Sequence, residues 1–309
     1  MSIPNVDDRP LIVEAEDPNG TFYGVDPRPH AFRRPFRGID RIDEQRFVVP
    51  AAGLITRVDL LMSRVHAKRL RARLRYDYSL MRETSPGIFR LPGAQDLTIN
   101  HMTGMYYDSG HYFAYVPRTE PGRRLGIMVF LHGHAGNFRL FIWRWRSLAL
   151  RANLAVIAPS FGFGIWGRES ARIVESSLND ALGRWPVIDP AQGLWLSGLS
   201  AGGSGVIRSS NLRPWNGLVF LSAVMPQKLA GRACDSPGKS VPGILVLNGQ
   251  ADHNVSHGSV RRGVDFFRSR GVKVEHHVYN EEDHYMTFAE ADDVDNRMLS
   301  WMNSVGPTN

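Results

Sequence analysis

From about residue 125 onward, short apolar runs alternate with longer stretches whose apolar positions recur at helical spacing. Continuous apolar runs are typical of strands that are buried on both faces of a sheet. They predict strands over 127–131, 155–158, 194–198, 218–221, 244–247 and 274–279. The stretches between them predict helices over 138–151, 168–184, 202–211, 258–270 and 287–303. This alternation predicts an α/β protein with a mostly parallel sheet and helices on both faces.

The chain before residue 96 shows no such alternation of apolar runs and helical stretches. Residues 1–50 are rich in Pro, Arg and Asp and predict loops, and residues 52–66 predict a short helix. Apolar and polar residues alternate strictly over 69–80, which favours a half-buried strand. The alternative is a helix, because Leu, Ala and Arg are good helix formers. A helix would gather basic side chains on one face: Arg57, Arg64, Lys68, Arg71 and Arg75.

Two further strands are expected over 96–108 and 111–116, joined as a hairpin around Asp108–Gly110. We therefore divide the chain into a basic N-terminal extension, residues 1–95, and an α/β domain, residues 96–309. Between Arg28 and Arg75 there are 13 Lys and Arg and 4 Asp and Glu, a balance of +9 against +7 for the whole chain. A solvated basic face explains this charge, and an anionic surface is the alternative partner. No zinc finger or RNP-like sequence accompanies it, so no nucleic acid is expected to bind.

Composition excludes several classes of protein. With 309 residues and 43% hydrophobic residues, the chain is long enough to bury a core and is not predominantly disordered. Its single cysteine, Cys234, excludes an intrachain disulfide framework. No apolar run approaches the ~20 residues that span a bilayer. The first residues lack the basic and apolar regions of a secretory signal, which favours the cytoplasm.

The sequence Gly-Leu-Ser-Ala-Gly at 198–202 follows a predicted strand and precedes a predicted helix. This is the Gly-x-Ser-x-Gly pattern of a nucleophile elbow, where a tight turn exposes a serine above the sheet. Small neighbours are required because the backbone of such a turn is strained. A glycine-rich helix start would leave the same pattern, but its position between strand and helix favours Ser200 as a nucleophile.

A serine hydroxyl needs a base, and the base needs an orienting carboxylate. Asp252 follows the strand 244–248, and His284 follows the last strand, so both come after the serine in the expected order. The other histidines are weaker candidates. They lie close behind Asp252 in the chain (His253, His257) or within the last strand (His276, His277). The sequence therefore predicts a triad of Ser200, Asp252 and His284.

An oxyanion hole needs backbone N–H donors aimed at the developing negative charge. Ala201, which follows the serine, is expected to supply one donor. The glycine-rich loop 132–138 is expected to supply the other from His134, with Ala135 as the alternative. The residues His132 and His134 also raise the alternative of a metal site, but they lack a nearby carboxylate and form a poor ligand set. No metal and no cofactor is therefore expected.

Together, His132-Gly133, Gly198-Leu-Ser-Ala-Gly-Gly203, Asp252 and Asp283-His284 resemble the alpha/beta-hydrolase superfamily. The elbow is similar to those of polyhydroxybutyrate-depolymerase-like and feruloyl-esterase-like members, and the spacing of the triad is similar to the small carboxylesterase group. The loop 132–138 departs from both the Gly-Gly-Gly form of lipases and the cysteine-containing form of the depolymerase-like group. The resemblance covers residues 96–309 and implies a sheet of about eight strands and hydrolysis through an acyl-enzyme.

The aromatic residues Phe161, Phe163 and Trp166 follow the strand 155–158 and are expected to line the substrate pocket, with the core as the alternative. Only residues 222–243 separate two strands where this fold commonly carries a cap, so an open site is expected unless the N-terminal segment covers it. An open site suits short or polymeric esters. We therefore predict a serine esterase. The alternatives are a serine peptidase with the same triad and a peripheral protein whose basic segment meets an anionic surface.

Overall fold

The computed structural model describes residues 11–26, 43–59, 62–102, 110–236, 238 and 241–306. Within these residues the chain forms one sheet of nine strands in the order β1-β2-β3-β5-β4-β6-β7-β8-β9. The strands are β1 (Leu11–Asp17), β2 (Gly20–Asp26), β3 (Tyr112–Pro117), β4 (Gly126–Leu131), β5 (Leu154–Pro159), β6 (Leu194–Leu199), β7 (Gly217–Leu221), β8 (Ile244–Gly249) and β9 (Val274–Tyr279).

The sheet is parallel from β5 to β9 and antiparallel at the other edge. The apolar runs of β4 to β8 are fully buried, as expected for strands covered on both faces. The predicted α/β class and mostly parallel sheet are therefore confirmed. The sheet has one strand more than the eight expected. The hairpin β1–β2 extends the sheet at one edge, where β2 pairs with β3. The prediction of loops for residues 1–50 is wrong over 11–26, where the two strands pair in register from Leu11 opposite Asp26. It is also wrong over 44–50, which form the start of a helix, Glu44–Val58.

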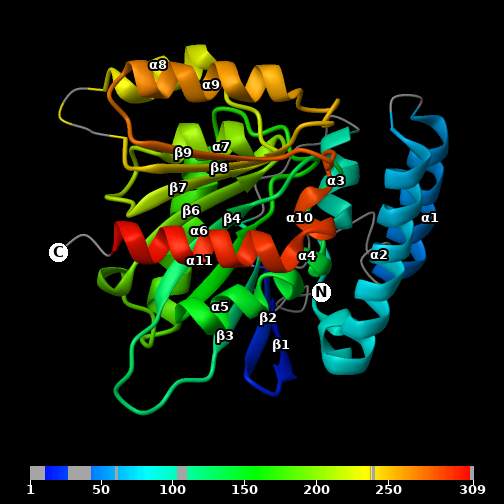
Figure 1. Cartoon of the computed structure of the whole chain (residues 1–309). Coiled ribbons are helices and arrows are strands. Elements are labelled where there is room, and N and C mark those ends of the chain that lie inside the picture. Colours follow the sequence, from blue (N-terminus) through cyan, green and yellow to red (C-terminus); the bar gives the residue numbers. More distant parts are fainter. Residues whose placement is uncertain are drawn as a thin grey trace, which may run out of the picture.

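Helices cover both faces of the sheet (Figure 1). On one face, the core is built with α6 (Ser170–Arg184), α7 (Gly202–Ser209), α8 (Gln227–Cys234) and α9 (His257–Ser269). On the other, it is built with α4 (Arg139–Arg144), α5 (Arg146–Ala152), α10 (Met286–Ala289) and α11 (Ala291–Val305). Except for α8, which was not predicted, these helices lie where the apolar spacing predicts them, although two predicted helices are each interrupted. No helix in the described ranges is both long enough and apolar enough to cross a membrane.

Three helices of the N-terminal region stand beside the sheet: α1 (Glu44–Val58), α2 (Arg64–Thr84) and α3 (Gln95–Met102) (Figure 1, blue to cyan-green). We refer to α1–α3 as the cap. The strand predicted over 69–80 is wrong, because this stretch lies inside α2. The prediction of a helix over 52–66 is wrong in its bounds, and the strand predicted over 96–108 is wrong as far as Met102. The remainder of that strand, residues 103–108, lies outside the described residues, as does most of the predicted hairpin turn.

The helix α2 forms because its apolar residues also recur at helical spacing. The positions Ala67, Leu70, Leu74, Tyr78 and Met81 are buried on one face, and the side chain of Ser63 caps the N-terminus by accepting the His66 N–H. The alternation over 69–80 fitted a strand as well. The helix wins because its buried face packs against α1, α4 and α10. The division of the chain at residue 95 stays a prediction, and elements on both sides of it belong to the same sheet.

Candidate active site

Ser200 lies in the turn between β6 and α7 with a left-handed backbone, at φ 54°. This conformation is strained for a residue other than glycine and is characteristic of functional turns. The flanking glycines are required by close packing. A Cβ on Gly198 would lie 2.7 Å from the carbonyl carbon of Gly202, and a Cβ on Gly202 would lie 2.3 Å from the Leu131 oxygen. The turn therefore has the local geometry expected of a nucleophile elbow.

The two predicted partners of the serine lie in the loops after β8 and β9. The Nε2 atom of His284 is 3.0 Å from Ser200 Oγ, and its Nδ1 atom is 2.8 Å from Asp252 Oδ2. The other carboxylate oxygen of Asp252 accepts the Val255 N–H at 2.8 Å, which fixes the carboxylate plane. The structure thus brings together three residues that are 32 and 52 positions apart in the sequence.

The two loops are also joined by their backbones, because the N–H of Ala251 donates to the Glu282 carbonyl at 2.9 Å. The remaining histidines of this region bond elsewhere. His253 Nε2 lies 2.8 Å from Asp59 of the cap, and His276 Nε2 lies 2.7 Å from the side-chain oxygen of Asn248. Burial lowers the pKa of His276 to about 4, with a further contribution from His257. Its imidazole is therefore neutral at pH 7.

Ala201 and His134, the residues predicted to supply the oxyanion donors, line the same cavity as Ser200. Among the described residues, neither backbone N–H donates a hydrogen bond to the protein. The alternative donor, Ala135, has a left-handed backbone at φ 78°. Partial burial, together with the nearby His284, lowers the pKa of the His134 imidazole. That ring stacks on Phe163 with 5.5 Å between ring centroids.

His132 is fully buried at the start of the loop 132–138 and connects this loop to the one that follows β5. Its Nε2 atom accepts the Phe161 N–H at 3.0 Å, and its Nδ1 atom lies 2.7 Å from the Gly133 carbonyl. One nitrogen must accept and the other must donate, so the ring is a neutral imidazole. Burial lowers the pKa of His132 to about 4, consistent with this state. The two nitrogens are thus occupied within the protein, which leaves no lone pair for a metal.

Lowering the pH from 7 to 5 is expected to destabilise the fold through His132. Its pKa is lowered in the folded state, so the unfolded chain binds more protons below pH 6.5 and the stability falls toward pH 4. The loss attributable to His132 is about 2 kcal/mol between pH 7 and pH 5. Urea denaturation of the wild type and His132→Gln at both pH values measures it. The wild type should lose more free energy of unfolding than the variant, and equal losses would contradict the assignment. His276→Asn is a second test, because the pKa of His276 is lowered in the same direction, so this variant should also lose less free energy of unfolding than the wild type.

A cavity of about 740 Å³ lies between the cap and the carboxyl edge of the sheet and reaches Ser200 and His284. An open site was expected unless the N-terminal segment covers it. The N-terminal region does cover the site, so the site is not open. Of the aromatic residues expected in the pocket, Phe163 lines this cavity. The structure places Phe161 and Trp166 in the core instead, where their rings stack at 5.0 Å. Trp166 also donates its indole N–H to the His132 carbonyl at 2.8 Å.

The cap supplies cavity residues that sequence reasoning missed: Phe47, Val48, Ala51, Ala52, Thr56, Leu70, Leu74, Gln95, Thr98, Ile99 and Met102. For α2, the helical spacing of Leu70, Leu74 and Tyr78 could have indicated a buried helix face, but the alternation of the same stretch favoured a strand. No sequence signal related α1 or α3 to the serine, because their approach to it depends on packing between distant segments.

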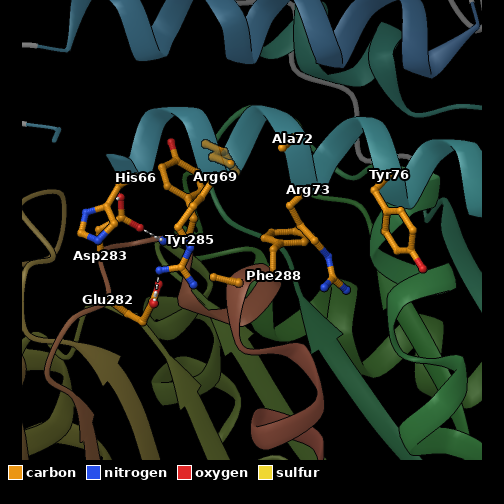
Figure 2. Close-up of a pocket in the computed structure, with 11 residues that line it drawn as sticks. His66, Arg69, Ala72, Arg73, Tyr76, Glu282, Asp283, Tyr285 and Phe288 are labelled. Carbon is orange, nitrogen blue, oxygen red and sulfur yellow. Dashed lines mark hydrogen bonds and ion pairs between the residues drawn. The ribbon is translucent and has the colours of Figure 1, made fainter. Parts of the chain in front are cut away.

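The cap also contacts the loop that carries His284. The guanidinium of Arg69 pairs with Glu282 at 2.6 Å and with Glu290 at 3.2 Å. His66 on the same helix lies 2.8 Å from the Glu281 carbonyl and 3.6 Å from Asp283. Figure 2 shows these side chains of α2 turned toward the loop, at one end of a second, smaller cavity. The cap is therefore attached to the loop that positions His284.

No family model matches the sequence, and no curated protein matches it. Solved structures do match its fold. An esterase from Pyrobaculum calidifontis aligns with a TM-score of 0.53 at 14% identity, covering 64% of this chain and 81% of that one. Esterase B from Lactobacillus rhamnosis aligns with a TM-score of 0.52 at 14% identity, covering 63% and 80%. An acylaminoacyl peptidase from Pyrococcus horikoshii aligns with a TM-score of 0.50 at 9% identity. The alignment covers 64% of this chain and 40% of the peptidase.

These similarities define the class of fold. The chain has the alpha/beta-hydrolase fold, as its sequence motifs predicted. It spans about 40% of the length of the peptidase. The subgroup suggested by the elbow sequence stays a prediction.

Proposed function

We propose that this protein is a serine hydrolase that cleaves carboxylic esters through an acyl-enzyme. One observation carries the proposal: a continuous hydrogen-bond chain runs from Asp252 through His284 to Ser200 and ends in a cavity. An orienting carboxylate, a base and a hydroxyl in this arrangement are the components of nucleophilic acyl transfer. The esterases of similar fold support the choice of an ester.

The proposed mechanism has two stages. Ser200 Oγ attacks the ester carbonyl while His284 Nε2 takes the hydroxyl proton, and Asp252 stabilises the resulting imidazolium. The N–H groups of Ala201 and His134 stabilise the oxyanion. The tetrahedral intermediate collapses as His284 gives its proton to the leaving alcohol. Water then attacks the acyl-enzyme with His284 again as the base, which releases the acid and restores Ser200.

An amide substrate would use the same residues, and the fold is similar to that of an acylaminoacyl peptidase. The covered cavity does not favour a folded polypeptide, and this chain spans a minority of that peptidase. An ester is therefore the preferred substrate, and matched p-nitrophenyl esters and p-nitroanilides of one acid distinguish the two activities.

Covalent labelling is expected to identify Ser200. An alkyl fluorophosphonate should phosphonylate its Oγ with release of fluoride, because the adduct is tetrahedral and its oxygen can occupy the oxyanion site. Intact-mass and peptide mass spectrometry should find one label per chain on the peptide containing Ser200, with parallel loss of p-nitrophenyl butyrate hydrolysis. Ser204→Ala, one turn further along α7, should label like the wild type. Label on another serine, or activity that survives complete labelling, would contradict the proposal.

A further inference from the structure

We propose that the cavity under the cap binds a long hydrocarbon chain of the substrate ester. This inference rests on the proposed function and specifies its substrate class. It replaces the short or polymeric ester that an open site would suit.

The walls of the cavity are predominantly apolar. The cap contributes Leu70 and Leu74, and the catalytic side contributes aromatic residues such as Phe138, Phe141 and Phe288. A volume of about 740 Å³ lies well within the range of preformed ligand pockets, roughly 300–1,000 Å³. A cavity of this size and chemistry favours an extended apolar group over water.

Polar groups in the cap wall are largely engaged within the protein. The Glu44 carboxylate accepts the N–H groups of Arg139 and Leu140 at 2.8 and 3.0 Å and the Tyr78 hydroxyl at 2.9 Å. Thr56 accepts from Arg71 at 2.7 Å and donates to the Gly53 carbonyl at 3.2 Å. Glu44 and Thr56 therefore need no hydrogen bond from a ligand. The exception is Gln95, which also lines the cavity and whose side-chain oxygen is buried without a hydrogen-bond partner among the described residues. Along the rest of this wall, dispersion and burial are the main contributions to binding.

The cap is attached to the catalytic side at several separate places. Glu44 binds the start of α4, and Asp59 pairs with His253, the neighbour of Asp252. Arg69 binds the loop before His284, as Figure 2 shows. Because the cap is fixed to the catalytic side at these separate places, its apolar wall is in place before a substrate binds. A preformed wall lowers the ordering cost of binding a flexible chain.

The chain that enters the cavity belongs to either the acid or the alcohol of the ester, and both have the same hydrocarbon chemistry. Burial of one methylene group is expected to raise kcat/KM about fourfold while the chain still fills the cavity. The rise should end when the cavity is full. A site that is open to solvent would give a much weaker dependence on chain length.

Two substrate series test the proposal, both with monomeric substrates. One varies the acid from acetyl to decanoyl with p-nitrophenol as the constant leaving group. The other varies the alcohol from ethyl to decyl with acetate as the constant acid. At least one series should show the rise with chain length in the wild type. The series that shows it identifies the half of the ester in the cavity. A flat or falling dependence in both series would overturn the inference.

A substitution in the cavity wall locates the effect. Ala52 lies on α1 and lines the cavity, so Ala52→Trp should fill part of it. We expect kcat/KM for the longest favoured substrate to fall at least tenfold, with less than a twofold change for the shortest ester. The matched control is Leu54→Trp on the same helix, because Leu54 is 64% exposed and lies outside the wall. It should retain the wild-type dependence on chain length.

Far-UV circular dichroism and the urea midpoint serve as the folding check for Ala52→Trp. If that variant does not fold, Ala51→Phe replaces it, since Ala51 also lines the cavity. An equal loss at all chain lengths in a folded variant would overturn the inference. Failure of the proposed function looks different: no ester of either series would be hydrolysed in a Ser200-dependent manner. Hydrolysis of acetyl esters alone would leave the proposed function standing and refute the hydrocarbon-chain site.

Discussion

Replacing Ser200 with alanine is expected to lower the kcat of ester hydrolysis by about a millionfold, and His284→Ala should cost about as much. The serine would supply the attacking oxygen, and the histidine would remove its proton. Neither group accelerates acyl transfer without the other. The double variant should therefore be no slower than either single variant, whereas independent contributions would multiply. Initial rates on p-nitrophenyl butyrate at equal protein concentration, with far-UV circular dichroism to confirm that each variant is folded, measure the three values.

Asp252→Asn tests the third member of the hydrogen-bond chain. The carboxylate accepts from Nδ1 of His284, and an amide in its place favours the wrong histidine tautomer, which should lower kcat about 10⁴-fold. The control is His257→Gln, because His257 follows the same strand and contacts Asn248 instead of the serine. It should stay within a few-fold of the wild type. For the Ser200 and His284 variants, a double variant whose loss of kcat is the product of the two single losses would contradict a triad that acts as one unit.

Replacing Glu44 with alanine is expected to lower the free energy of unfolding by about 3–5 kcal/mol. The Glu44 side chain is fully buried and faces the guanidinium of Arg139, which is 2% exposed, at 3.4 Å. Its two oxygens also accept two backbone N–H groups at the start of α4 and the hydroxyl of Tyr78. Removal of the carboxylate takes the anionic partner from the buried Arg139 guanidinium, which keeps its bonds to the Leu91 carbonyl. It also removes the acceptor of the two backbone N–H groups and the Tyr78 hydroxyl, which is far more costly than the loss of an exposed pair.

Urea denaturation followed by tryptophan fluorescence measures the effect as a shift in midpoint. Tyr78→Phe is the matched control, because it removes one of the hydrogen bonds to Glu44 and keeps the carboxylate. It should cost about 1 kcal/mol. If Glu44→Ala costs no more than Tyr78→Phe, the carboxylate does not hold the cap to α4. A separate early transition in the variant would show that the cap detaches before the sheet unfolds.

Much of the fold follows from local patterns that tertiary contacts reinforce. The strands β4 to β9 were predicted from their apolar runs, and the helices between them, except α8, from apolar residues at helical spacing. The elbow at Ser200 was equally readable, because Gly198 and Gly202 are adjacent to it and their close packing excludes larger residues. Its two partners were predicted from their position after strands, since the carboxyl ends of parallel strands meet at one edge.

The N-terminal region shows where local patterns mislead. The stretch 69–80 satisfied the spacing of a strand and of a helix at once, and the decision depends on which face finds a partner. In α2 the face with Leu70, Leu74 and Tyr78 meets α1, α4 and α10, while Tyr76 is left 59% exposed. The prediction of the pocket residues was only partly right for a similar reason. Phe163 lines the cavity, whereas Trp166, three residues away, is held in the core by His132.

The sequence by itself determined the α/β class, the order of the catalytic-domain elements and the candidate triad of Ser200, Asp252 and His284. These depend on periodicity within elements and on short motifs, which are local properties of a chain. Only the tertiary structure decided that the first hundred residues add two strands to the sheet and cover the site. That outcome depends on contacts such as Glu44 with Arg139 and Asp59 with His253, between residues 95 and 194 positions apart. No local pattern encodes such a pairing, because its free energy arises only when the distant surfaces meet.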